Sequence, residues 1–156
     1  MTGRRLVSLA GRVVIAGLMA LALVTATPVQ AADDDVITKM SAGRIERIMA
    51  SFNDVKNFKE AGNNLYTFET AGLKIVLHNG GETLQIAAFF TGKATLSRLN
   101  EWNRTKKFSR AYLDKDDNVC LDHVMELTGG VTEKNVKEWM GTFVSCLKEF
   151  KKHLAE

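Results

Sequence analysis

Residues 65–90, LYTFETAGLKIVLHNGGETLQIAAFF, decide the fold class of this sequence. They contain runs of strand length that are rich in β-branched and aromatic residues and are separated by AG and NGGE. Asn79-Gly80 and Gly72 can adopt the left-handed backbone that tight hairpins demand. The stretch therefore predicts antiparallel strands in a meander, over 65–70, 73–78 and 83–90.

A further strand and a helix precede this stretch. VKNFKE (55–60) adds a first strand to the meander, so that four strands follow one another. Upstream, apolar residues recur at helical spacing between 36 and 52. Asp33 to Asp35 are well placed at the N-terminus of such a helix, where negative charge is favoured. The apolar positions are Val36, Ile37, Met40, Ile45, Ile48, Met49 and Phe52.

The next segments predict a helix and then a strand. ATLSRLNEWNRT (94–105) has the spacing of a helix of about three turns. FSRAYLD (108–114) follows as a strand on which Phe108 and Tyr112 share one face. The apolar face of the helix comprises Leu96, Leu99 and Trp102. Trp102 is therefore expected to anchor a core.

The remaining residues predict one more strand and a closing helix. In 118–127, Val119, Leu121, Met125 and Leu127 alternate with polar residues and Cys120, so one face is expected to be buried. Thr132 is a suitable N-cap for a last helix with a broad apolar stripe. The element order α-β-β-β-β-α-β-β-α predicts an α+β domain, an antiparallel sheet packed by helices.

Residues 1–31 have the parts of a secretory signal peptide. Its positive N-terminal region contains Arg4, Arg5 and Arg12. The uncharged run 13–26 is shorter than the roughly 18–20 residues of a membrane span. We expect cleavage after Ala31 and export to the periplasm or the exterior, with membrane contact only during export. Residues 32–156 would then form a single domain.

Removal of this signal changes the charge balance. The chain has 21 Lys and Arg against 18 Asp and Glu, and three Arg but no acidic residue lie in 1–31. The mature chain would therefore carry 18 basic against 18 acidic residues. A protein of zero formal net charge has no overall field that attracts a polyanion. We expect no nucleic acid as a partner.

Export also bears on Cys120 and Cys146. Outside the cytosol two thiols can pair in a disulfide. Cysteine is equally common as a small apolar core residue. A bridge requires the two Cα atoms to lie within about 7 Å, and the sequence does not give this distance. Both interpretations therefore stay open.

Few residues suggest catalysis or metal binding, and we expect neither catalytic residues nor a cofactor. His123 and Glu126 are the nearest to a metal-ligand pair, but residues three apart on a strand point to opposite faces. DKDDNV (114–119) resembles the start of a calcium loop. However, Val119 stands where the turn glycine belongs and Met125 where the closing glutamate belongs.

Charge is segregated along the C-terminal half. Five basic residues and one acidic residue lie between Arg98 and Arg110, whereas five acidic residues and one basic residue lie between Asp114 and Glu126. The two groups can neutralise each other, which contributes little stability, or they can form a recognition surface. The candidate partner-binding rim consists of Arg104, Lys106, Lys107 and Arg110.

The sequence resembles the YbjN family over essentially the whole of residues 32–156, and the stretch from residue 99 to 136 carries the most specific part of the resemblance. The residues that carry this resemblance are Asn100, Glu101, Trp102, Asn103, Phe108, Tyr112, Gly129, Gly130 and Thr132. The resemblance implies a fold similar to that of type III secretion chaperones. It also implies a role in regulating sensory transduction, without an established catalytic activity. Those chaperones bind protein segments and often dimerise, so the resemblance implies a protein partner of unknown identity or a homodimer.

We therefore expect an exported, non-catalytic regulatory module that acts through protein–protein contacts, in envelope stress or signalling. One alternative is a metal-binding or hydrolytic envelope protein that uses His78, His123 and the acidic hairpin near 114–118. Another is a protein that binds anionic lipid or cell wall through the basic rim of 104–110. Binding that survives high salt would argue against this last alternative.

Overall fold

The structure is a computed structural model that describes residues 35–155. The expected signal peptide and its cleavage point after Ala31 lie outside these residues. The elements are α1 Ala42–Ala50, β1 Lys56–Gly62, β2 Leu65–Thr70, β3 Leu73–Asn79, β4 Thr83–Phe90, α2 Leu96–Thr105, β5 Arg110–Leu113, β6 Val119–Glu126 and α3 Glu133–Ala155. This order and the α+β class are the predicted ones.

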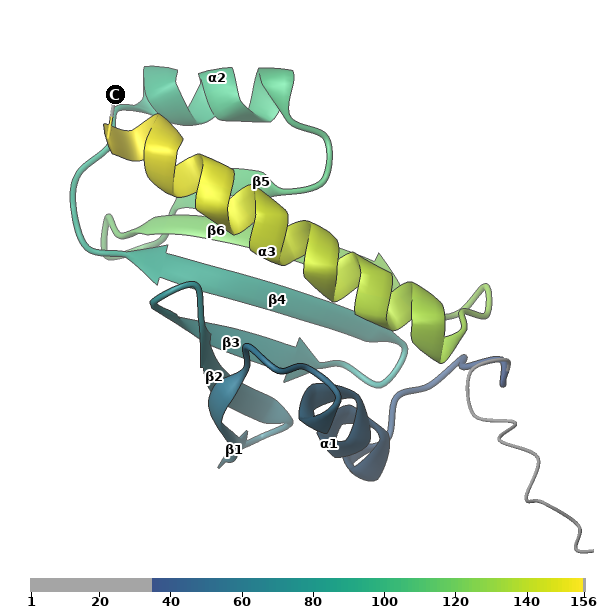
Figure 1. Ribbon diagram of the computed structural model, residues 1–156. Coiled ribbons are helices and arrows are strands. Elements are labelled where there is room, and N and C mark those ends of the chain that lie inside the picture. The colour runs from purple at the N-terminus through teal and green to yellow at the C-terminus, as the bar shows by residue number, and fades with distance from the viewer. Residues whose placement is uncertain (1–34, 156) are drawn as a thin grey trace, which may run out of the picture.

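All strands belong to one antiparallel sheet, whose helices lie on one side (Figure 1). The sheet has six strands in the order β1-β2-β3-β4-β6-β5, so β6 lies between β4 and β5. α3 runs diagonally across the middle strands, with α1 beside the β2–β3 end and α2 over β5. Within the described residues, no helix is long and apolar enough to cross a membrane.

The core lies between the sheet and α3. Every second residue of β2, β3, β4 and β6 faces this layer, because side chains alternate along a strand. α3 contributes Phe150, whose ring meets those of Phe90 and Trp102 edge-on at centroid distances of 5.1 and 4.9 Å. The buried apolar residues of α3 are Val136, Trp139, Met140, Phe143, Leu147 and Phe150. Burial of each large apolar side chain contributes about 1.5–3 kcal/mol.

Two-residue turns join the first three strands. Ala71 and Gly72 both have positive φ, as do Asn63 and Asn64 between β1 and β2. Positive φ at both central residues is the type I′ geometry, whose twist matches that of the flanking strands. Gly72 was predicted to serve this purpose, and asparagine tolerates the same conformation.

The turn between β3 and β4 differs from the prediction. Neither Asn79 nor Gly80 has positive φ, and Gly81 has it instead. The Asn79 side chain donates to the Met40 carbonyl at 3.0 Å and accepts from the Gly81 amide at 2.9 Å. The turn therefore binds the segment that leads into α1, and it has three residues, 80–82, between the strands.

The first helix begins later than predicted. Ser41, rather than Asp35, caps α1 by accepting from the Arg44 amide, while the Asp35 carboxylate lies 4.0 Å from the Arg44 guanidinium. Asp33 and Asp34 lie outside the described residues. Upstream, Ile37 pairs with Val131 through reciprocal backbone hydrogen bonds of 2.7 and 3.0 Å. Ile37 and Met40 are thus buried from an extended segment and Val36 is exposed, although the spacing of all three also suited a helix.

Three predictions in the C-terminal half need correction. Leu96 is 65% exposed, because it occupies the first position of α2, while Leu99 and Trp102 are buried. Phe108 is exposed and precedes β5, so it does not share a strand face with Tyr112. The first half of β6 is buried on both faces. Thr132 accepts from the Asn135 amide at 3.2 Å and caps α3 as predicted.

Candidate functional site

The side of the sheet that carries no helix is the candidate site, and we call it the uncovered face. Its side chains alternate with those of the core. One row of paired residues crosses all the strands, from Lys59 through Thr67, Val76, Ala87 and Asp122 to Arg110. On either side of this row Phe89 and Val124 are 44% and 50% exposed, and both lie on this same face.

A hydrogen-bonded carboxylate lies at the centre of the uncovered face. Arg110 approaches Asp122 with both arms of its guanidinium, Nη2 to Oδ2 at 2.7 Å and Nε to Oδ1 at 3.2 Å. The Gln85 amide donates to the same Oδ2 at 2.8 Å. The Asp122 side chain is almost fully buried, and these three bonds satisfy it as a buried charge requires. Hydrogen bonding to Asp122 raises the pKa of Arg110.

Tyr112 and Cys120 extend this cluster along β5 and β6. The Arg110 guanidinium lies over the Tyr112 ring, 5.1 Å from its centroid, in a cation–π arrangement. Burial raises the pKa of the Tyr112 hydroxyl, which is therefore neutral. Burial likewise raises the pKa of Cys120 to about 11, so its thiol is protonated and unreactive. This part of the face has no activated nucleophile.

Both edges of the sheet are protected. At the β5 edge, the Asn103 side chain donates to the Ala111 carbonyl and accepts from the Ala111 amide, both at 2.8 Å. The amide group thus takes the place of a neighbouring strand. At the other edge, β1 is interrupted by register shifts and carries Lys56 and Lys59. Bulges and lysines are common devices against pairing with another chain.

The predicted basic rim is divided between two sides of the molecule. Lys106 forms an ion pair with Glu149 of α3 at 2.6 Å and lies over the Trp102 ring. Arg110 points to the uncovered face and pairs with Asp122. Arg104 and Lys107 are exposed. A role of these four residues in binding a partner stays a prediction.

The histidines and the acidic hairpin do not converge. His78 is exposed on the uncovered face, whereas His123 lies on the helical side, with its ring 5.5 Å from that of Trp139. Burial lowers the pKa of His123. Asp114 closes the hairpin by accepting from the backbone of Asp116 and Asn118, and the bonds from Asn118 lower its pKa. In residues 35–155 no three His, Cys, Asp or Glu side chains are grouped to hold a metal.

The two cysteines are free thiols in this structure. Cys120 lies on the uncovered face, because it pairs with Phe89 and Tyr112 across the strands. Cys146 belongs to α3, which covers the opposite face. The disulfide that the sequence left open is therefore not formed, because the sheet separates the two residues.

The residues behind the family resemblance have mainly structural positions. Trp102 is buried and donates to the Ser109 hydroxyl at 3.1 Å, and Asn103 holds β5. Gly130 has a φ of +81° in the turn that leads to α3. Asn100, Glu101 and Gly129 are exposed.

Sequence reasoning missed the uncovered face itself. The alternation of Gln85, Ala87 and Phe89 with core residues along β4 was a usable signal, because these three had to point away from the helices. The cluster around Asp122 had no comparable signal. Its partners Gln85 and Arg110 lie 37 and 12 residues away in the sequence.

Comparison with known proteins gives one family. The family model YbjN, described as "Putative bacterial sensory transduction regulator", matches residues 69–156. The match spans most of the sheet, α2 and α3. No curated protein matches the sequence.

Proposed function

The chain belongs to the YbjN family, and we propose that it acts as a non-catalytic regulatory module that binds another protein through the uncovered face. The description of the family as regulators supports the regulatory part of this proposal. The contact with a protein is our inference from the surface. The export expected from the sequence places the proposed contact in the periplasm or outside the cell.

Two exposed apolar side chains, Phe89 and Val124, which flank the Asp122 cluster on β4 and β6, are the observation that carries the proposal. Protein interfaces have an apolar centre enriched in aromatic residues and arginine, and hot spots are enriched in tyrosine and arginine. Arg110 and Tyr112 belong to the same face, on β5 next to Asp122 and Cys120. Because Arg110 is already neutralised by Asp122, burial under a partner would not leave an unpaired charge.

The same surface defines the chemistry of the partner. The arginine–carboxylate pair at its centre is internally balanced, and Phe89 and Val124 lie exposed on either side of it. The surface therefore favours a protein with exposed apolar side chains over a highly charged ligand. Strand addition is less favoured, because Asn103 occupies the β5 edge and bulges interrupt β1.

The two alternatives receive less support. An anionic lipid or cell-wall polymer would require the rim cations on one side, and Lys106 and Arg110 are on different sides and paired. A metal-dependent or hydrolytic site would require His78 and His123 to approach each other, and they lie on opposite faces of the sheet.

Site-specific photo-crosslinking in the envelope fraction tests the proposal. A photoreactive residue at Phe89 or Val124 should capture one defined protein, and Val124→Asp should abolish capture from position 89. Leu96 is the matched control, since it is also an apolar side chain and is more exposed than Phe89 and Val124, but it lies on α2. Equal capture from position 96, or capture that Val124→Asp leaves unchanged, would contradict the proposal. Self-capture alone would identify the partner as a second copy.

A further inference from the structure

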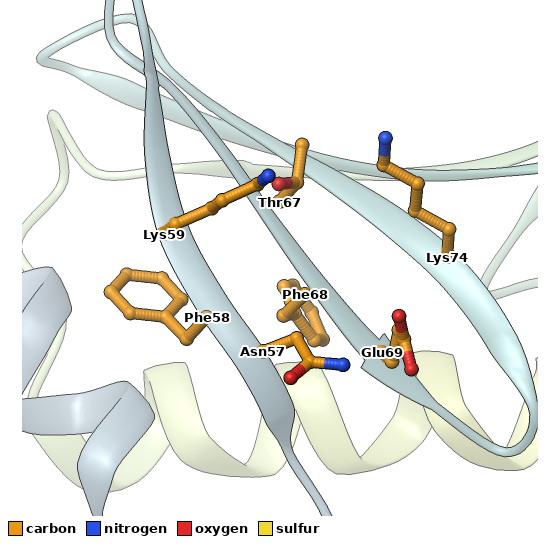
Figure 2. Close-up of a pocket in the computed structure, with 7 residues that line it drawn as sticks. All are labelled: Asn57, Phe58, Lys59, Thr67, Phe68, Glu69 and Lys74. Atoms are coloured by element: carbon orange, nitrogen blue, oxygen red, sulfur yellow. The ribbon is translucent and has the colours of Figure 1, made fainter.

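A bulge in the edge strand β1 opens a hollow on the uncovered face. Lys56 pairs with Glu69 and Lys59 with Thr67, so β1 uses one more residue than β2 over this interval. Asn57, within the bulge, has a φ of +54°. The hollow beside the bulge has a volume of about 440 Å³ and is shown in Figure 2. Bulges of this kind are common beside functional sites.

Thr67 contributes a buried hydroxyl to this hollow. The residue is only 9% exposed, and its Oγ1 has no hydrogen-bond partner among the described residues. A buried hydroxyl without a partner is destabilising, and most such groups in proteins are satisfied. Its hydroxyl can donate to an acceptor that enters the hollow.

Two ammonium groups can reach the same space. Lys59 lies directly opposite Thr67, and Figure 2 shows its side chain extending from β1 toward the Thr67 hydroxyl. Lys74 lies on β3, diagonal to Thr67, within reach of a long side chain. In the described part of the chain neither lysine forms an ion pair. Glu69 is the single carboxylate that lines the hollow, so the lining carries a net charge of one positive unit.

From this geometry we propose that the hollow binds a small oxyanion, a carboxylate or phosphate group, between Lys59, Lys74 and the Thr67 hydroxyl. The oxyanion would accept hydrogen bonds from three donors, of which two are cationic. It would satisfy the Thr67 hydroxyl, which the protein itself leaves unsatisfied. This site lies on β1 to β3, apart from the pair Phe89 and Val124, so the inference does not depend on the proposed protein contact.

An NMR titration of the uniformly ¹⁵N-labelled protein tests this inference. Inorganic phosphate and acetate are added separately at constant ionic strength, with chloride as the reference anion. We expect saturable shifts at millimolar concentration, confined to the amides around residues 59, 67 and 74. The more tightly bound anion identifies whether the ligand group is a phosphate or a carboxylate. Absence of saturable shifts with both anions would overturn the inference.

Three variants separate a built site from general attraction to lysines. Lys59→Gln and Thr67→Val should each weaken binding by about tenfold or more, the effect of losing one hydrogen bond to a charged group. Lys134→Gln, on the exposed side of α3, should leave binding unchanged. The melting temperature of the Thr67→Val variant should also equal or exceed that of the unchanged protein, because the substitution removes an unsatisfied hydroxyl. Equal weakening in all variants, or none in Lys59→Gln and Thr67→Val, would overturn the inference.

Discussion

Replacement of Asn103 by alanine should free the outer edge of β5. The side-chain amide of Asn103 forms two hydrogen bonds with the backbone of Ala111. It donates to the Ala111 carbonyl and accepts from the Ala111 N–H, both at 2.8 Å. Alanine removes both bonds and leaves the α2 backbone unchanged. Asn100→Ala is the matched control, since Asn100 lies one turn earlier on the exposed side of α2. Both replacements gain the same helix propensity, about 0.5 kcal/mol.

The size of the effect follows from the two bonds. Each contributes about 0.5–1.5 kcal/mol to the free energy of unfolding. Because Asn103 is an exposed residue, water can replace part of each bond, and the lower half of the range applies. We expect Asn103→Ala to be less stable than Asn100→Ala by about 1–2 kcal/mol. For a domain of this size that difference lowers the melting temperature by about 3–8 °C.

Urea unfolding and hydrogen exchange measure the two consequences separately. Urea unfolding gives the difference in free energy of unfolding between the two variants. Hydrogen exchange gives the protection of the Ala111 backbone N–H, which should fall about tenfold when alanine replaces Asn103. Asn103→Asp provides an intermediate case, because it keeps the acceptor for the Ala111 amide but loses the donor. If Asn103→Ala matched Asn100→Ala in stability and the Ala111 amide stayed protected, Asn103 would not hold the edge.

Three further results are expected. Asp122→Asn should cost about 1–2 kcal/mol in urea unfolding, less than a fully buried pair, because the Arg110 side chain is 65% exposed. Since the pKa of His123 lies below its ordinary 6.5, urea unfolding should show stability falling as pH drops below 6.5, and His123→Gln should flatten this dependence. Thiol titration of the native protein should label Cys146 alone, with Cys120 reacting after unfolding; a mass deficit from disulfide formation would contradict this.

The sheet was predictable because its signals are local. β2 and β4 begin and end at the predicted residues, since strand alternation and short turns lie within the same stretch of sequence. The start of α1 was not predictable in this way. Ile37 and Met40 are buried as expected, but from an extended segment, because Val131 and Asn79 bind their backbones.

The candidate site was less predictable than the fold. Asp122 is one of the polar residues that alternate with the apolar ones in 118–127, which favours an exposed position, yet it is buried beneath Arg110 and Gln85. Its burial depends on which strands are neighbours, and β6 lies between β4 and β5 rather than after β5. A pattern read along one strand contains no information about this insertion. The hollow beside Thr67 depends in the same way on a register shift.

The position of α3 also determines when the protein can fold during its synthesis. α3 follows all the strands in the described part of the chain, and its C-terminal turns supply Phe150, which packs against both Phe90 and Trp102. While the ribosome still holds these residues, the middle of the core side of the sheet lacks the cover of α3. The bridge between Ile37 and Val131 also forms only after residue 131 has been synthesised. Contacts between such distant residues form late. A premature stop codon within α3 would therefore release a chain with an exposed apolar sheet, prone to aggregation and proteolysis.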